Sequence, residues 1–239
     1  MLLAVALDNP ITWAVIIGWI MSVVLHEFAH GLVAHLGGDY TIRQRGGLTL
    51  NPLQYVDPVF SIILPAVFVM MGGIPLPGGV TYIRMDLLRS RGWQSAVSAA
   101  GPFTNFLLFL ALCLPFHPKL GWVDPFAANT QIPNWQMFCA GLAYLQMMAV
   151  VLNLIPIPPL DGFGILSPYM EPTMREKLTT PPASTVAFLA YFLVVWKVPQ
   201  VIQWIYDLVH RIQQVLGFDY FSMELMRRSY NLALFGHTD

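Results

Sequence analysis

Apolar residues in this chain are concentrated in five runs that contain no Asp, Glu, Lys or Arg. The runs cover residues 9–26, 58–83, 92–118, 125–160 and 178–196. A helix needs about 20 consecutive, mostly apolar residues to cross the hydrocarbon core of a bilayer. Each run reaches or approaches this length, so the pattern predicts several membrane-spanning helices.

Three segments have the pattern of a complete spanning helix. We expect these helices at 11–36, 94–116 and 135–155. Pro10 suits the first turn of the first helix, where a backbone N–H is not needed. Pro156 and the prolines after it stop the third helix, because proline cannot continue a helix.

The chain between the first two predicted spans is less regular. Residues 40–50 predict a small β-hairpin at the membrane surface, around Gly46 and Gly47. The apolar stretch 59–71 is short, contains Pro65 and is flanked on both sides by basic residues. Because basic loops favour the cytoplasm, a re-entrant segment fits, as does a pair of short broken helices, whereas one full crossing does not.

The last apolar region is interrupted at Lys197 and Pro199. It fits either one kinked span followed by an interfacial helix, or two short spans. The predicted fold class is therefore all-α, a polytopic membrane helix bundle of about four to six transmembrane segments. No repeat or linker divides the chain, so we expect one domain over 1–239, with a catalytic core at about 11–165 and C-terminal helices at about 183–239.

Charged residues make up 10% of the chain, against about 25% in an ordinary soluble domain. With 56% apolar residues, this composition excludes intrinsic disorder and argues against a soluble protein. A net charge of −1 provides no basic surface for a polyanion, so nucleic acid is not an expected partner. Lys- and Arg-rich loops favour the cytoplasm, and the loops expected there contain Arg43, Arg45, Arg84, Arg89, Arg91, Arg175 and Lys177.

The most informative motif is His26-Glu27-Phe28-Ala29-His30, at the end of the first apolar run. Residues four apart on a helix share a face, so His26 and His30 can present two imidazole nitrogens to one metal ion. Glu27 lies beside them and can accept a proton from an activated water, which is the arrangement of zinc proteases. The alternative is a polar cluster that faces lipid headgroups, but such a cluster does not require this spacing.

A zinc ion with two His ligands needs at least one more protein ligand and an open position for water. Asp161 is the best candidate, because it is the only carboxylate between Pro125 and Tyr169 and directly follows the fourth run. The prolines before it break the helix, and unwound backbone at membrane depth is tolerated only where protein or a watery cavity covers it. The alternative is a turn at the membrane exit, in which Asp161 caps the next helix.

Four motifs follow one another between residues 20 and about 165. They are His26-Glu27-x-x-His30-Gly31, Leu48-Thr49-Leu50-Asn51-Pro52-Leu53 with Asp57-Pro58, Ala99-Ala100-Gly101-Pro102-x-x-Asn105, and Asn153-x-x-Pro156-x-x-x-Leu160-Asp161-Gly162. In this order they resemble the site-2 protease family of intramembrane zinc metalloproteases, in its compact subgroup without PDZ or CBS domains. The chain departs from the subgroup at Tyr55, where His is frequent.

The resemblance implies one Zn2+ ion held by His26, His30 and Asp161, with Glu27 as the general base. It also implies that Asn105 and Asn153 hold the substrate backbone or stabilise the oxyanion, a role that suits an amide donor. From the residues alone, an Asn in a spanning helix is more often an interhelical hydrogen-bonding group.

The expected function is the hydrolysis of peptide bonds within or near transmembrane segments. The expected partners are the lipid bilayer and, as substrate, a transmembrane protein or a signal-peptide remnant. We expect a multi-pass protein of a prokaryotic cytoplasmic membrane with its site toward the cytoplasm. The competing class is a metal transporter or an inert binding protein, but a transporter places ionisable groups along a path across several spans. The sequence names neither the substrate nor the oligomeric state.

Overall fold

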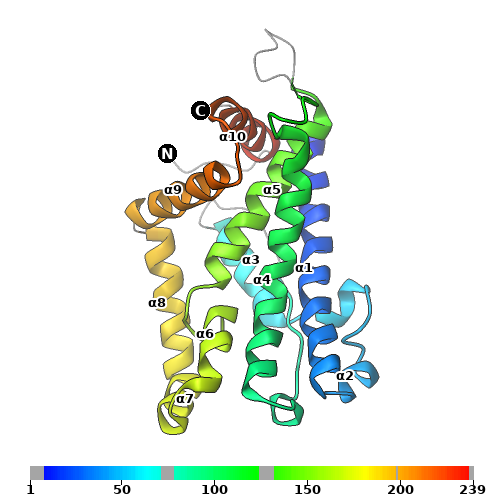
Figure 1. Ribbon diagram of the computed structural model, residues 1–239. Coiled ribbons are helices and arrows are strands. Elements are labelled where there is room, and N and C mark those ends of the chain that lie inside the picture. The colour runs from blue at the N-terminus through cyan, green and yellow to red at the C-terminus, as the bar shows by residue number, and fades with distance from the viewer. Residues whose placement is uncertain (1–7, 71–77, 124–131, 198, 237–239) are drawn as a thin grey trace.

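The computed structural model describes residues 8–70, 78–123, 132–197 and 199–236, and these ranges contain helices and no strand. Its centre is a bundle of three helices that lie side by side: α1 (Pro10–Gly37), α4 (Arg91–Cys113) and α5 (Asn134–Asn153) (Figure 1). Each of them is long and apolar enough to cross a membrane. This confirms the three predicted helices.

Local sequence sets the ends of α1 as expected. The Asn9 side chain accepts a hydrogen bond from the Ile11 N–H at 2.9 Å, and Pro10 occupies the first turn. Gly38, with φ of 125°, ends the helix in a conformation that favours glycine. Between these ends α1 packs against α4 and α5, and the buried core of the bundle includes Val15, Phe109, Cys113, Ala140, Ala143, Tyr144 and Met147.

The predicted β-hairpin at 40–50 was wrong. The structure has a short helix there, α2 (Thr41–Gln44), followed by turns. Asp39 explains the helix, because its carboxylate accepts hydrogen bonds from the Thr41 N–H at 3.1 Å and from the Thr41 hydroxyl and so satisfies the first turn. Gly46, with φ of 79°, then redirects the chain.

The apolar segment after α2 consists of short helices: η1 (Pro52–Tyr55), the π-helix η2 (Pro58–Ile63) and α3 (Leu64–Met70). The chain at 78–84 is extended and returns beside their beginning. The Gly78 N–H donates to the Phe60 carbonyl at 2.9 Å, and the Val80 N–H donates to the Tyr55 carbonyl at 3.0 Å. The chain before and after the apolar stretch therefore lies at one level, as a re-entrant segment requires. Residue 71, the last of the predicted stretch 59–71, lies outside the described residues.

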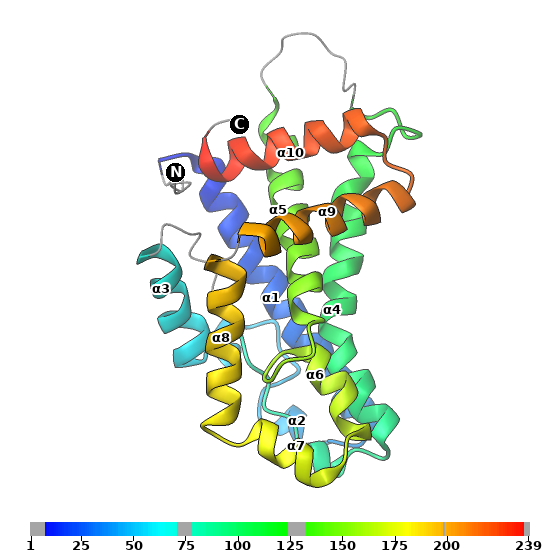
Figure 2. The same cartoon turned by 90° about the vertical axis from the view of Figure 1, so that its left-hand side faces the viewer.

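The C-terminal part contains α6 (Asp161–Leu166), η5 (Ser167–Tyr169), α7 (Pro172–Thr179), α8 (Ala183–Lys197), α9 (Pro199–Val215) and α10 (Tyr220–Phe235). Helix α8 runs along the bundle, whereas α9 and α10 lie across its end (Figure 2). The helix boundary between α8 and α9 falls at Lys197 and Pro199, where the sequence predicts an interruption; whether α8 spans the membrane stays a prediction. Three described helices meet the length and composition of a span, so the predicted count of four to six is not confirmed.

Candidate metal centre

The two histidines of α1 meet Asp161, the first residue of α6, inside the bundle. The Nε2 atoms of His26 and His30 lie 3.0 Å apart. The Asp161 carboxylate lies 3.2 Å from the first Nε2 and 3.3 Å from the second. Both imidazoles are buried. Three groups that are predicted as metal ligands from distant parts of the sequence thus converge on one point.

Close packing of α6 against α4 places Asp161. The Ser95 hydroxyl of α4 donates to the Ile165 carbonyl of α6 at 2.7 Å. Gly164 faces Ser98, and a Cβ atom at this glycine would lie 2.4 Å from the Ser98 hydroxyl oxygen. Only a residue without a side chain fits there, so the first turn of α6 is held against the bundle and Asp161 is directed at α1.

Gly101 leaves room for an ion between the histidines. A Cβ atom at Gly101 would lie 2.4 Å from the Nε2 atoms of both His26 and His30. Zinc–nitrogen bonds of about 2.0–2.1 Å in a tetrahedral site place ligand atoms roughly 3.3 Å apart, close to the separations in this cluster. The donor set of two imidazoles and one carboxylate is also one that zinc accepts. The residues present therefore fit a zinc ion.

Hydrogen bonds at the far nitrogens orient both imidazole rings. His30 Nδ1 lies 2.6 Å from the Val97 carbonyl oxygen, which can only accept a hydrogen bond. His26 Nδ1 is hydrogen-bonded to the side-chain oxygen of Asn105. With the protons on Nδ1, both Nε2 lone pairs face the common centre, which is the usual orientation of a metal-binding histidine.

Glu27 lies on α1 next to this centre and is buried. Its backbone carbonyl accepts a hydrogen bond from the Thr81 hydroxyl at 3.1 Å. A Cβ atom at Gly79 would lie 3.0 Å from Glu27 Cγ and from Val23 Cγ1. The extended segment 78–84 therefore forms a wall against Glu27, and the absence of a side chain at Gly79 permits this approach.

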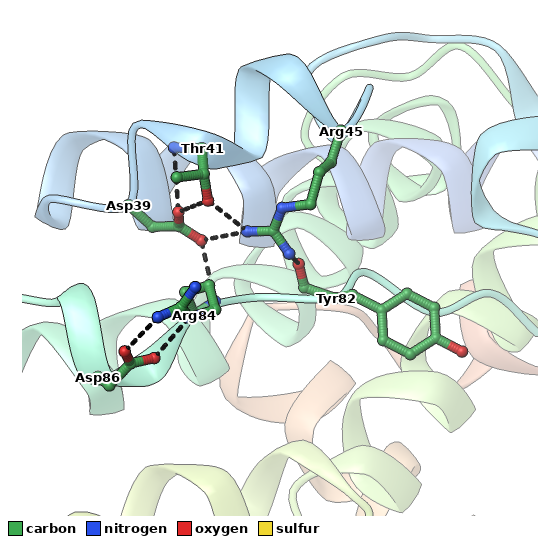
Figure 3. A network of polar contacts seen from close by, with 6 residues as sticks. All are labelled: Asp39, Thr41, Arg45, Tyr82, Arg84 and Asp86. Atoms are coloured by element: carbon green, nitrogen blue, oxygen red, sulfur yellow. Dashed lines mark hydrogen bonds and ion pairs between the residues drawn. The ribbon is translucent and has the colours of Figure 1, made fainter.

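A cluster of polar residues around Asp39 attaches this wall to the end of α1 (Figure 3). The buried Asp39 carboxylate accepts hydrogen bonds from Arg45 at 2.8 Å and from the Arg84 N–H at 2.9 Å. Arg45 also donates to the Tyr82 carbonyl at 2.6 Å. Burial alone would raise the pKa of Asp39, but the donors from Thr41, Arg84 and Arg45 hold this pKa below its usual value. We call Asp39, Thr41, Arg45, Tyr82 and Arg84 the Asp39 cluster.

An apolar cavity of about 350 Å³ is lined by Gly79, the same residue that packs closely against Glu27. Val23 and Val24 of α1 form one side, and residues of η1 and η2 form the other. Tyr55 lines it too and is fixed by its hydroxyl, which donates to the Thr49 carbonyl at 2.6 Å. The side chain that departs from the subgroup pattern is thus a structural part of the cavity wall.

Several named proteins are similar to this chain over most of its length. "Putative zinc metalloprotease Rip2" of Mycolicibacterium smegmatis is 39% identical over 196 residues, which cover 82% of this chain and 71% of the relative. A Mycobacterium tuberculosis protein of the same name is 38% identical over 203 residues, covering 85% and 74%. "Putative zinc metalloprotease YwhC" of Bacillus subtilis is 32% identical over 188 residues, covering 77% and 80%. No family model and no solved structure matches the chain.

These relatives are members of the site-2 protease family, and the alignments cover more than two thirds of each of them. This chain belongs to the site-2 protease family. The relatives' names specify zinc, which agrees with the His26, His30 and Asp161 cluster. In this site-2 protease His26 and His30 lie on α1, which is one of three described helices that are long and apolar enough to cross a membrane.

The structure shows the hydrogen-bond partners of Asn105, whose expected substrate role stays a prediction. Its side-chain oxygen meets His26, and its nitrogen donates to the Gln146 side chain at 2.6 Å. Both ends of the amide therefore form hydrogen bonds between helices, and the contact with His26 orients that imidazole in this site-2 protease. Asn153 closes α5 and is partly buried; its substrate role stays a prediction.

Sequence reasoning missed Ser22 and Gln146, which continue the contacts of Asn105. Both are buried, and the Gln146 nitrogen donates to the Ser22 hydroxyl at 2.8 Å. The available signal was the presence of polar side chains deep in apolar runs, where they are costly unless paired. That signal indicates a partner but does not say which one, because the partner depends on how α1, α4 and α5 are rotated.

Proposed function

We propose that this protein is an intramembrane zinc protease that hydrolyses peptide bonds within or near transmembrane segments of membrane proteins. One observation carries the proposal: His26, His30 and Asp161 converge in a buried cluster, and the buried Glu27 directly follows His26 on the same apolar helix. The metal does not need Glu27 as a ligand, so this residue is free for proton transfer.

The depth of the cluster supports cleavage inside the membrane. His26 and His30 lie 11 and 7 residues before the end of α1 at Gly37, which corresponds to roughly 16 and 10 Å along the helix. In the described helices α1, α4 and α5, the charged residues are Glu27 and Arg91, and Arg91 is the first residue of α4. The charge is thus confined to one depth, whereas a transport path would distribute it along the bundle.

The chemistry follows from the positions of these groups. When bound, a zinc ion supplies Lewis acidity and lowers the pKa of water to about 7. Glu27 accepts one proton from the attacking water as its oxygen bonds to the carbonyl carbon. Glu27 then returns this proton to the nitrogen as the carbon–nitrogen bond breaks, so that a carboxylic acid and an amine leave, and the acid gives up its remaining proton to solvent. The Val97 carbonyl and the Asn105 side chain hold the two imidazoles in place throughout.

The apolar cavity beside Glu27 supports a hydrophobic substrate. Its volume of about 350 Å³ is in the range of ligand pockets, and its exposed wall residues Leu53, Val56 and Ile62 are apolar. An apolar side chain of a transmembrane segment would occupy it while the adjacent peptide bond lies at Glu27.

Basic residues support an orientation with the site toward the cytoplasm. The end of the bundle nearest the histidines carries Arg43, Arg45, Arg84, Arg89 and Arg91, and the α7 region carries Arg175 and Lys177. By the preference of basic loops for the cytoplasm, this end faces inward in a prokaryotic cell membrane. The substrates that fit are transmembrane proteins or signal-peptide remnants.

Cleavage in a defined bilayer tests the proposal. The purified full chain is placed in lipid vesicles with a single-pass membrane peptide, and fragments are identified by mass spectrometry. We expect cuts within or near the spanning segment, loss of cutting with a zinc chelator, and recovery when zinc is added back. Cutting that persists after the zinc has been removed would contradict the proposal.

A further inference from the structure

A row of buried polar side chains crosses the bundle and ends at the metal centre. It begins at the Trp19 carbonyl of α1, which accepts a hydrogen bond from the Ser22 hydroxyl at 2.7 Å. Gln146 of α5 donates to Ser22 at 2.8 Å and accepts from Asn105 of α4 at 2.6 Å. Asn105 then meets His26 Nδ1. Gln146 is 0% exposed, Asn105 2% and Ser22 3%, so bulk solvent does not reach the row.

The chemistry of each group gives this row one direction. A carbonyl oxygen can only accept, so the single Ser22 proton is used on Trp19 and the Ser22 oxygen remains to accept. Gln146 must therefore direct its NH2 at Ser22 and its oxygen at Asn105. The Asn105 amide is then fixed in turn, with its NH2 toward Gln146 and its oxygen toward His26.

The direction of the row decides the tautomer of His26. The Asn105 oxygen can only accept, so His26 must carry its proton on Nδ1. Nε2 then has a free lone pair, and this is the atom that lies 3.2 Å from Asp161. If the amides were reversed, the Asn105 NH2 would face Nδ1, the proton would move to Nε2, and His26 could not bind a metal through that atom.

We propose that Gln146 and Ser22 are positioning residues of the metal centre, which act through Asn105 to fix the His26 tautomer that binds zinc. The inference rests on the zinc site of the proposed function. His30 achieves the same orientation with one backbone carbonyl, which needs no such row because a carbonyl cannot reverse. His26 is instead oriented by an amide, and an amide requires further groups to fix its direction.

Zinc affinity of the purified full chain tests the inference without any substrate. The probe is zinc alone, in competition with a chelator dye in detergent. Gln146→Leu should weaken zinc binding by about 10- to 100-fold, the usual effect of losing a group that orients a ligand. The matched control is Gln136→Leu, the same change at a buried position of the same helix, and it should leave the zinc affinity unchanged.

A double-mutant comparison separates positioning from general loss of structure. In an Asn105→Ala background, Gln146→Leu should cost no further zinc affinity, because its effect passes through Asn105. Thermal unfolding of the zinc-free variants shows whether each still folds. If Gln146→Leu does not fold, Ser22→Ala provides the same test and should weaken zinc binding severalfold.

Two results are decisive and distinguishable. Equal zinc affinities for the wild type and a folded Gln146→Leu or Ser22→Ala variant would overturn the positioning role and leave the proposed function intact. Additive losses in the Asn105→Ala background would overturn it as well. A wild-type chain that binds no zinc would instead overturn the proposed function itself.

Discussion

At the scale of single residues, Gly101 has a role that depends on the absence of a side chain. The space in front of both imidazoles exists because α4 presents a glycine there, and a methyl group would lie 2.4 Å from both Nε2 atoms. That distance is well below van der Waals contact and similar to a zinc–nitrogen bond. Helix α4 thus forms one wall of the site, and the candidate ligands come from α1 and α6.

Replacing Gly101 with alanine should therefore remove the metal while the helix remains. We expect Gly101→Ala to reduce bound zinc from about one ion per chain to almost none, measured by elemental analysis after dialysis. The control is Gly92→Ala on the same helix, where the nearest heavy atom to the new methyl group would be Ser90 Oγ at 3.6 Å. In an ordinary helix position the substitution is favourable by about 0.5–1 kcal/mol. Full zinc content in Gly101→Ala would refute the role of this glycine.

The convergence of the candidate metal ligands could be predicted from the sequence, whereas their hydrogen-bond partners could not. His26 and His30 follow from helical spacing alone, and Asp161 follows from its isolation after a broken helix. Gln146 and Ser22 depend on how three helices are rotated and paired, which no local pattern encodes. The same limit explains Asn105, whose motif was noticed but whose contact with His26 required the packed bundle.

At the scale of elements, the Asp39 cluster links the end of α1 to the extended segment 78–84. The Asp39 carboxylate accepts a hydrogen bond from the Thr41 N–H and so stabilises a helical turn where a hairpin was predicted. It also accepts a hydrogen bond from the Arg84 N–H, which belongs to the wall beside Glu27. Sequence patterning predicted the long helices because their apolar runs are long. It failed at 40–50, because the conformation there depends on one buried charge and on a contact 45 residues away.

Asp39→Asn should weaken this link. The substitution removes the negative charge to which Arg45, Thr41 and Arg84 donate hydrogen bonds. We expect the free energy of unfolding to fall by about 1–3 kcal/mol. The control is Asp86→Asn, which breaks an exposed pair with Arg84 and should leave the stability almost unchanged. Denaturant unfolding in detergent measures both. Equal effects of the two substitutions would show that the Asp39 cluster is not a structural link.

The contribution of Asp39 should also depend on pH in a defined direction. Its pKa is lowered in the folded protein by its hydrogen-bond donors, so the folded state favours the carboxylate. The stabilisation is complete above the unfolded value of about 3.9 and is lost as the pH falls through the lower folded pKa. The stability difference between the wild type and Asp39→Asn should be constant from neutral pH to about 4 and shrink below it.

At the scale of the whole molecule, α1, α4 and α5 form the bundle, α8 lies along one side of it, and α9 and α10 lie across one end (Figures 1 and 2). Helix α8 has 15 residues, about 22 Å at 1.5 Å per residue, and α9 turns across the end of the bundle (Figure 2). The interruption at Lys197 and Pro199 indicated a break but not its angle. The metal centre lies toward the end of the bundle that bears α2, α6 and α7 (Figure 1).

Site-directed labelling tests the orientation of the whole molecule. In a variant with Cys113 and Cys139 replaced by alanine, single cysteines are introduced by Arg43→Cys and Lys119→Cys, at exposed positions beyond opposite ends of the bundle. A membrane-impermeant thiol reagent added to intact cells should label the cysteine at position 119 and leave the one at position 43 unlabelled. After the cells are opened, the reagent should label the cysteine at position 43 as well. The reverse pattern would place the site on the external side.

The central claim is that Glu27 performs proton transfer beside a zinc ion that it does not bind. Glu27→Gln and the control Glu176→Gln, on the exposed face of α7, are compared with the wild type in the same vesicles, measuring zinc content and peptide cleavage together. We predict that all three proteins hold about one zinc ion, and that Glu27→Gln alone loses cleavage by at least about 100-fold. Cleavage by Glu27→Gln at the wild-type rate would contradict the account.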